Sequence, residues 1–174
     1  MEWMVAPEGF DDQCKSQFGD LVRKALDNEL DDWATEAKSC LALVVLLDQL
    51  PRNIYRGTPE SFSGDVKAAE IAVKAIAQEF DKSVTVIEAS AFYIPLLHQE
   101  NLISLVAARS LIEALKVRST TDEENDWVDK GIAASKHHAG IVMKFGRYPT
   151  RNAILERKNT EAEEEFLETN KSLL

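Results

Sequence analysis

The chain has 174 residues, a length that suits one domain with a substantial buried core. Hydrophobic residues make up 45% of the sequence, which excludes the composition of a disordered chain. The formal net charge is −10, and this balance opposes a general role on DNA, RNA or anionic membranes, because phosphate binding is driven mostly by Lys and Arg. We therefore expect a single domain over residues 1–174 with no nucleic-acid partner and no membrane partner.

The two cysteines, Cys14 and Cys40, do not form a Cys-x-x-Cys pair, so the sequence offers no cysteine-based zinc site. The longest apolar run, Cys40 to Leu47, is far too short for a membrane span. The acidic start of the chain lacks the basic region of a signal peptide. These patterns predict a cytoplasmic protein with two buried thiols, no metal and no cofactor.

Two helices are predicted before the first proline-containing loop. The first covers residues 11–30 and begins at Asp11, whose carboxylate can cap the free amides of the first turn. Its apolar stripe consists of Cys14, Phe18, Leu21, Val22 and Ala25. The second helix covers residues 34–49 and is apolar on all sides at its centre, so we expect it to be the central element of the fold, ended by Pro51.

A loop over residues 52–64 leads to a helix over residues 65–80. The apolar side of that helix is predicted to carry Val66, Ala69, Val73, Ile76 and Phe80.

Three later helices carry the same start signal, a Thr followed three residues later by a Glu. In such a capping box each side chain satisfies a backbone amide at the helix start. The pairs are Thr85 with Glu88, Thr121 with Glu124, and Thr160 with Glu163.

Other residues mark the course of the later helices. Pro95 is expected to end or kink the helix that begins at Thr85, and a further apolar helix follows over residues 102–115. Gly146 is well placed to end the helix from Thr121.

Together these patterns predict an all-α fold, an irregular array of about seven helices in antiparallel hairpins. Helix starts are unevenly spaced, so a regular repeat of about 34 residues does not fit.

Two polar segments follow apolar helices and resemble each other. Residues 48–53 read Asp-Gln-Leu-Pro-Arg-Asn, and residues 145–152 read Phe-Gly-Arg-Tyr-Pro-Thr-Arg-Asn. If the two segments meet, the guanidiniums of Arg52, Arg147 and Arg151 converge and favour a carboxylate or phosphate ligand. The alternative is structural: Asp48 pairs with Arg52, and the other arginines hold loops together by binding carbonyls and acidic side chains.

The histidines carry further alternatives. His98 and Glu100 could act as a general acid and base, or pair structurally. His138 shares a helical stripe with Trp127, Ile141 and Phe145, so it is expected to point inward, where a satisfied core histidine is the ordinary alternative to a ligand.

Several of these segments, taken together, resemble a known family. Across nearly the whole chain the sequence is similar to the domain of unknown function 924 family. The resemblance implies an all-α fold related to the tetratricopeptide-like superhelix, and it implies no established activity. The matching residues are Phe10-Asp11, Leu41 to Leu43, Leu47 to Pro59, Asp65, Pro95 to Glu100, His138, Phe145 to Asn152, Thr160 and Phe166-Leu167.

The chain departs from the family pattern in three places. Only Trp3 remains of an aromatic Phe-Trp-Phe segment before the first helix. Thr150 stands where the family's Pro-His-Arg-Asn has its histidine, which weakens any catalysis that needs that side chain. Glu156 stands where the family has the glycine of Gly-Arg-Glu-Ser-Thr, so the turn there is expected to differ.

Three functions remain open on the sequence. The first is a helical binding domain whose polar pocket takes a small anionic molecule. The second is a protein–protein interaction module that uses the concave face of the helical array, and the third is a hydrolase or lyase acting on a small anionic metabolite. The predicted ligand-binding residues are Asp48, Gln49, Arg52, Asn53, His98, Glu100, His138, Arg147, Arg151 and Asn152.

Overall fold

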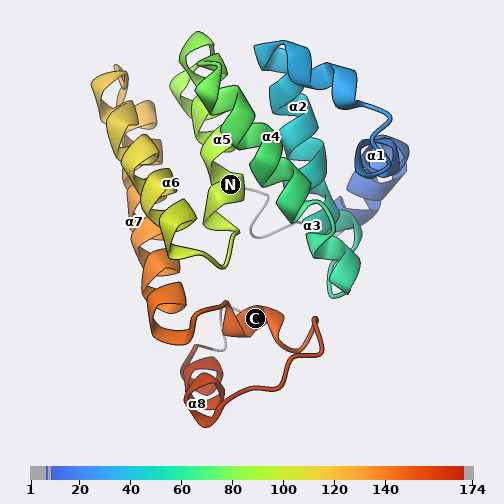
Figure 1. Cartoon of the computed structure of the whole chain (residues 1–174), viewed down its shortest axis with the longest axis vertical. Helices are drawn as coiled ribbons and strands as arrows, with labels where there is room; N and C mark the ends of the chain where they lie inside the picture. The colour runs from blue at the N-terminus through green and yellow to red at the C-terminus, as the bar shows by residue number, and fades with distance from the viewer. Residues whose placement is uncertain (1–6, 8, 171–174) are drawn as a thin grey trace.

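The computed structural model describes residue 7 and residues 9–170 (Figure 1). These residues form helices and connecting loops, and no strand occurs among them. The seven longer α-helices within this part of the chain agree with the predicted number, and α3 adds a short eighth. The helices are α1 (Phe10–Leu26), α2 (Ala37–Asp48), α3 (Leu50–Ile54), α4 (Asp65–Ala77), α5 (Val86–Leu97), α6 (Leu102–Ala114), α7 (Asp122–Phe145) and α8 (Glu161–Thr169).

Five short 3₁₀ helices lie in the connections between the α-helices of the described residues. They are η1 (Asp31–Thr35), η2 (Pro59–Phe62), η3 (Phe80–Ser83), η4 (Leu115–Val117) and η5 (Pro149–Arg151).

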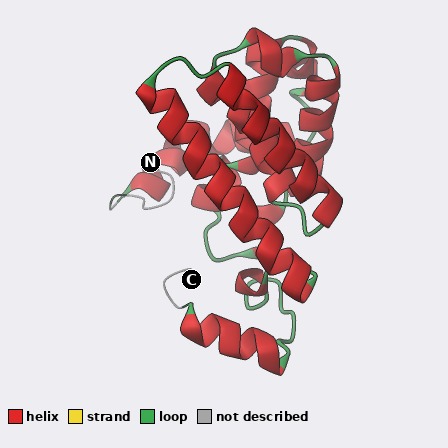
Figure 2. Ribbon diagram, turned by 90° about the vertical axis from the view of Figure 1, so that its left-hand side faces the viewer, coloured by secondary structure: helices red, strands yellow, loops and turns green. Residues whose placement is uncertain are grey.

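Helix α2 lies at the centre, as its apolar sequence predicts. It packs against α1, α4, α5 and η1, and most of its side chains from Cys40 to Asp48 are buried. On the other side of α5, helices α6 and α7 pack against each other (Figure 1). The segment after α7, with η5 and α8, lies at one end of the molecule (Figures 1 and 2). The helix ends near that segment are where the polar side chains gather.

The predicted capping boxes are confirmed. At Thr85, Thr121 and Thr160 the side chain accepts from the backbone amide three residues on, and the Glu at that position bonds back to the cap. Gly146 adopts a left-handed conformation with φ of 73° directly after α7, which ends the helix as predicted. The two cysteines are buried free thiols, also as predicted.

Several local predictions are wrong. Helix α1 has its N-cap at Gly9, because the carboxylate of Asp11 turns away to bind Asn53 and Arg56. Helix α2 ends at Asp48, close to the predicted end, but Pro51 does not lead into a loop; it stands in the first turn of α3, where a missing amide proton costs nothing. The predicted 52–64 loop therefore contains most of α3 and all of η2.

The predicted buried side of α4 is only partly right. Ile76 and Phe80 pack against the core as predicted, but Val66 and Val73 are exposed. The buried side chains of α4 are instead Ala68, Ile71, Ala72 and Ala75. Small side chains on this face let α4 approach α2 closely, so alanines rather than valines mark the contact.

Pro95 lies inside α5, close to its end. None of the helices formed by the described residues has the length and apolar character that a membrane crossing requires.

Candidate functional site

A buried aspartate and a half-buried histidine pair at the point where α2 and α5 end. Asp48 is the last residue of α2 and is 1% exposed, and His98 directly follows α5. The Nδ1 atom of His98 lies 2.6 Å from Oδ1 of Asp48. Burial raises the pKa of Asp48, but His98, Arg52 and the Gln49 amide attract its charge and hold the pKa below its usual value. Asp48 is therefore ionised and accepts the proton on Nδ1.

Two arginines from distant segments meet on a second aspartate. Arg52 of α3 donates to Oδ1 of Asp65 at 2.7 Å, and Arg151 of η5 donates to Oδ2 of the same carboxylate at 3.2 Å. Both guanidiniums also lie over the ring of Phe62, at 5.4 and 4.8 Å from its centroid. We call Asp48, Arg52, Asp65, His98 and Arg151 the polar cluster.

The polar cluster is continuous. Nη2 of Arg52 lies 3.7 Å from Asp48 and 2.7 Å from Asp65, so this guanidinium joins the two carboxylates. Arg151 is only 13% exposed, and burial together with the charge of Arg52 lowers its pKa. Two guanidiniums and a histidine face two carboxylates, which leaves the polar cluster with a positive balance whenever His98 is protonated.

His138 of α7 lies beside the polar cluster. Its ring packs edge-on against Tyr148 with centroids 5.3 Å apart, and its Nδ1 atom is buried without a hydrogen-bond partner among the described residues. Burial, followed by the positive charges of His98, His137 and the two cluster arginines, lowers the pKa of His138 to about 4. The side chain points inward as predicted and is neutral at physiological pH, but it is not a fully satisfied core histidine.

The carboxylates of Asp48 and Asp65 and the imidazole of His98 are close enough to hold a cation, with ligand atoms within 4.8 Å of one another. The guanidinium of Arg52 already lies between the two carboxylates, and Arg151 adds a second positive charge. A divalent cation would have to displace or approach both guanidiniums, and this repulsion opposes a metal ion at the cluster.

Five of the residues predicted for the site make contacts outside the polar cluster or at its edge. Gln49 donates to Asp48, Asn53 donates to Asp11 at 3.0 Å, and Asn152 donates to Asn159 at 2.7 Å. Glu100 accepts from Arg157 and from the backbone amide of Tyr148. Arg147 pairs with Glu163 at 2.7 Å and does not join the other two arginines.

The partner of His98 therefore differs from the one suggested by the sequence. The carboxylate at hydrogen-bond distance is Asp48, whereas Glu100 is engaged by Arg157 at 2.6 Å. Burial raises the pKa of Glu100, but its bonds to Arg157 and the Tyr148 amide hold the pKa below its usual value. Through its bonds to Arg157, Glu100 connects the loop after η5 to the end of α5.

A family model described as "Bacterial protein of unknown function (DUF924)" matches residues 1–171. The chain belongs to this family. A solved structure, "Structure of Protein of Unknown Function ATU0120 from Agrobacterium tumefaciens", is 33% identical over 97% of this chain and 89% of that chain, with a TM-score of 0.85. No curated protein matches the chain. Membership of DUF924 thus agrees with the observed all-helical fold and carries no activity with it.

The predicted ligand-binding residues of this DUF924 protein do not include Asp65, Phe62 and Tyr148, although Asp65 and Tyr148 lie in the segments that match the family. Asp65 reads as an ordinary first-turn carboxylate of α4, and Phe62 lies in a segment predicted as loop. Only tertiary contacts show that Asp65 binds two arginines and that both guanidiniums lie over the ring of Phe62. The sequence signal for Asp65 and Tyr148 was their place in the segments that match the family, and Phe62 had no such signal.

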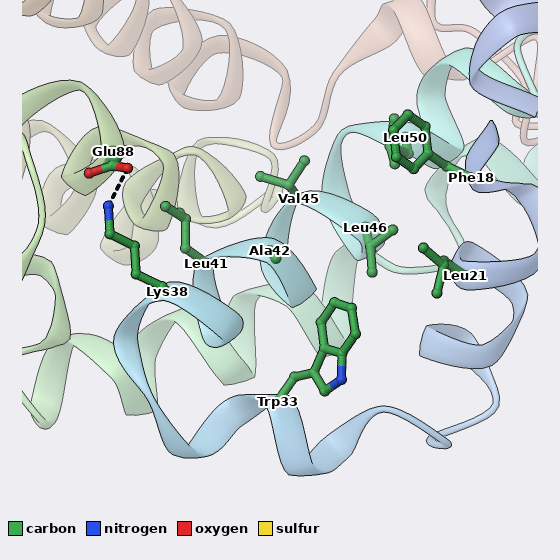
Figure 3. A pocket seen from close by; sticks show the side chains of 10 residues that line it. All are labelled: Phe18, Leu21, Trp33, Lys38, Leu41, Ala42, Val45, Leu46, Leu50 and Glu88. Carbon is green, nitrogen blue, oxygen red and sulfur yellow. Dashed lines mark hydrogen bonds and ion pairs between the residues drawn. The ribbon is translucent and has the colours of Figure 1, made fainter.

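A second feature of this DUF924 protein is an apolar groove that shares no residue with the polar cluster (Figure 3). The groove holds about 510 Å³ and has the Lys38–Glu88 ion pair at one end. Its exposed rim includes Phe18, which the sequence predicted as part of a buried stripe. The lining comes from α1, η1, α2, α3 and α5 and consists of Phe18, Leu21, Trp33, Lys38, Leu41, Ala42, Val45, Leu46, Leu50 and Glu88.

Proposed function

We propose that this protein binds a small anionic molecule, a carboxylate or a phosphate ester, at the polar cluster. The observation that carries the proposal is the meeting of Arg52 and Arg151 on one carboxylate and one aromatic ring. These arginines come from α3 and η5, at opposite ends of the helical array in sequence. In a protein with a net charge of −10, two adjacent guanidiniums form a local exception that would attract an anion.

Arg151 keeps donors for a ligand. Arg151 uses one Nη atom on Asp65, and its Nε and other Nη have no hydrogen-bond partner within the described chain and are not fully buried. The Nε2 atom of His98 also has no hydrogen-bond partner within the described chain and is not fully buried. An anion could therefore bind to these outward-facing groups without breaking the pair between Asp65 and the arginines.

The fold alone gives little reason for such a cluster. Removing charges from water costs several kcal/mol per ion, and apolar side chains of similar volume often stabilise a protein as well or better. Buried charges with shifted pKa values gather preferentially at functional sites. Asp48, Arg151 and the neighbouring His138 all have shifted pKa values, which supports a binding role for the polar cluster.

A thermal-shift screen against small carboxylates and phosphate esters tests the proposal. A compound present at about 100 times its Kd stabilises the native state by about 2.7 kcal/mol, or roughly 5 to 10 °C in Tm for a chain of this size. Arg52→Gln and Arg151→Gln should each abolish the shift. Arg147→Gln is the matched control, because Arg147 pairs with Glu163 and lies outside the polar cluster. Shifts that survive both cluster substitutions would refute the proposal.

The apolar groove favours a second candidate function, the binding of a protein segment with apolar side chains. Grooves of this type accept the apolar face of an amphipathic helix, and several lining side chains of α2 point into this one (Figure 3). Phage-displayed peptides captured by the protein test this candidate. Ala42→Asp, at an exposed position of the groove, should abolish capture, whereas Arg151→Gln should leave it unchanged. If the Ala42→Asp variant still captures the peptides, the groove is not their binding site.

A further inference from the structure

We infer that His98 is a general base held by Asp48, so that the proposed anion site is a catalytic site. The inference rests on the proposed binding of an anion at the polar cluster and adds a reaction to it. The class of substrate is a small carboxylate or phosphate ester that carries a removable proton or is attacked by water.

The pair has the geometry that fixes a tautomer. Asp48 is ionised and can only accept, so the short Nδ1···Oδ1 contact of 2.6 Å places the imidazole proton on Nδ1. The lone pair of the neutral ring is then on Nε2. The Gln49 amide binds the second oxygen of Asp48, and this bond keeps the carboxylate from turning away.

The free nitrogen is accessible. The side chain of His98 is 16% exposed, and Nε2 has no hydrogen-bond partner and is not among the fully buried polar atoms of the described residues. A carboxylate whose side chain is 1% exposed lies on one side of the ring, and water reaches the other. This is the arrangement that a positioned base needs.

The charges around His98 suit a proton transfer. When the substrate supplies the proton, its X–H bond breaks, the electron pair stays on X, and the proton moves to Nε2. When water attacks a phosphate ester, its O–H bond breaks and its oxygen bonds to phosphorus while the proton moves to Nε2. The P–O bond to the alcohol then breaks, and the leaving oxygen takes the proton from Nε2. The imidazolium that forms is stabilised by the Asp48 carboxylate. Arg52 and Arg151 are placed to stabilise negative charge that develops on the bound anion.

Neighbouring groups do not compete for this role. Burial and the positive groups around His138 lower its pKa to about 4, which makes that histidine a poor proton acceptor. Glu100 is held by Arg157, and no hydroxyl or thiol of the described residues is hydrogen-bonded to His98. His98 is therefore placed to act on water or substrate directly, since none of the described serines or cysteines is bonded to it as a nucleophile.

The first test is the tautomer of His98 in the wild-type protein, read from long-range ¹H–¹⁵N NMR spectra at a pH at which the imidazole is neutral. We expect the proton on Nδ1. Asp48→Asn should shift the population toward the Nε2–H form, whereas His137→Gln, which removes a neighbouring exposed histidine, should leave the His98 signals in place. A wild-type ring protonated on Nε2 would overturn the inference even if anions bind.

The second test follows the chemistry. A panel of hydroxycarboxylates and phosphate monoesters is incubated with the protein in D₂O, and consumption or deuterium uptake is followed by ¹H NMR. For compounds whose thermal shift requires Arg151, we expect turnover that falls about 100- to 10,000-fold in His98→Gln and is retained in His137→Gln. Binding through Arg151 with no chemical change in any compound would overturn the inference and leave the proposed function intact. If no compound binds in a way that requires Arg151, both the proposed function and the inferred catalysis are wrong.

Discussion

A β-carbon on Gly64 would lie 2.0 Å from the carbonyl oxygen of Leu47, because the residue before α4 touches the backbone of the last turn of α2. The residues that directly follow Gly64 and Leu47 are Asp65 and Asp48, the two carboxylates of the polar cluster. This close contact therefore sets the spacing that lets Arg52 bridge both carboxylates.

We expect Gly64→Ala to destabilise the protein by about 2 kcal/mol or more, since the new methyl group collides with backbone that cannot move freely. Gly140→Ala is the control. Gly140 lies in α7 with open space around its position, so alanine should stabilise the protein by about 0.5 to 1 kcal/mol through helix propensity. Urea unfolding of both variants measures the difference. A Gly64→Ala protein as stable as wild type would contradict the described contact.

Glu156 has a φ of 54°, the left-handed conformation that favours glycine, at the position where the family pattern has glycine. The turn keeps its left-handed shape and the glutamate is strained. We predict that Glu156→Gly stabilises the protein by about 1 kcal/mol, measured by urea unfolding. Glu156→Ala keeps the β-carbon and should give no such gain. An equal effect of both substitutions would show that the loss of the charge, and not backbone strain, is responsible.

His138 makes stability depend on pH. Its pKa is lowered from 6.5 to about 4 in the folded protein, so between these values the unfolded chain binds more protons than the folded one. Stability is therefore complete above pH 6.5 and falls as the pH drops toward 4, by on the order of 3 kcal/mol from this group.

The variant His138→Leu removes that titration. We expect it to lose about 2 to 3 kcal/mol less than wild type between pH 7 and 4.5, from urea unfolding at each pH. The carboxylates titrate in both proteins and cancel in the comparison. Identical pH dependence in the two proteins would mean that His138 titrates normally and is not buried as described.

The local features of the fold were the easiest to predict from the sequence. The capping boxes at Thr85, Thr121 and Thr160 and the end of α7 at Gly146 depend on residues within one turn, and all are confirmed. The central position of α2 was also predictable, because an apolar helix needs neighbours. The sequence did not show that one side of α2 stays open, with Ala42 exposed in the apolar groove.

Features that depend on tertiary contacts were not predictable. Asp11 has the sequence of an N-cap, but Arg56 and Asn53 reach it from α3 and its surroundings and take over its oxygens. The apolar face of α4 follows alanines, because close packing against α2 overrides the preference for larger side chains.

The candidate site shows the same division. The sequence pointed to Arg52, Arg151, Asp48 and His98 because polar residues after apolar helices need partners. It could not show that Arg147 binds Glu163 whereas Arg151 binds Asp65. Both arginines follow α7, and only the tertiary fold decides which carboxylate lies beside each of them.

The most direct measurement of the anion site is an NMR titration of the arginine Nε–H signals with inorganic phosphate and with malonate, assigned from Arg→Lys variants. We predict a saturable shift of the Arg151 signal with at least one of the two anions and no saturable shift of the Arg147 signal. An Arg151 signal that stays in place while exposed arginines such as Arg23 respond would show that the polar cluster does not bind these anions.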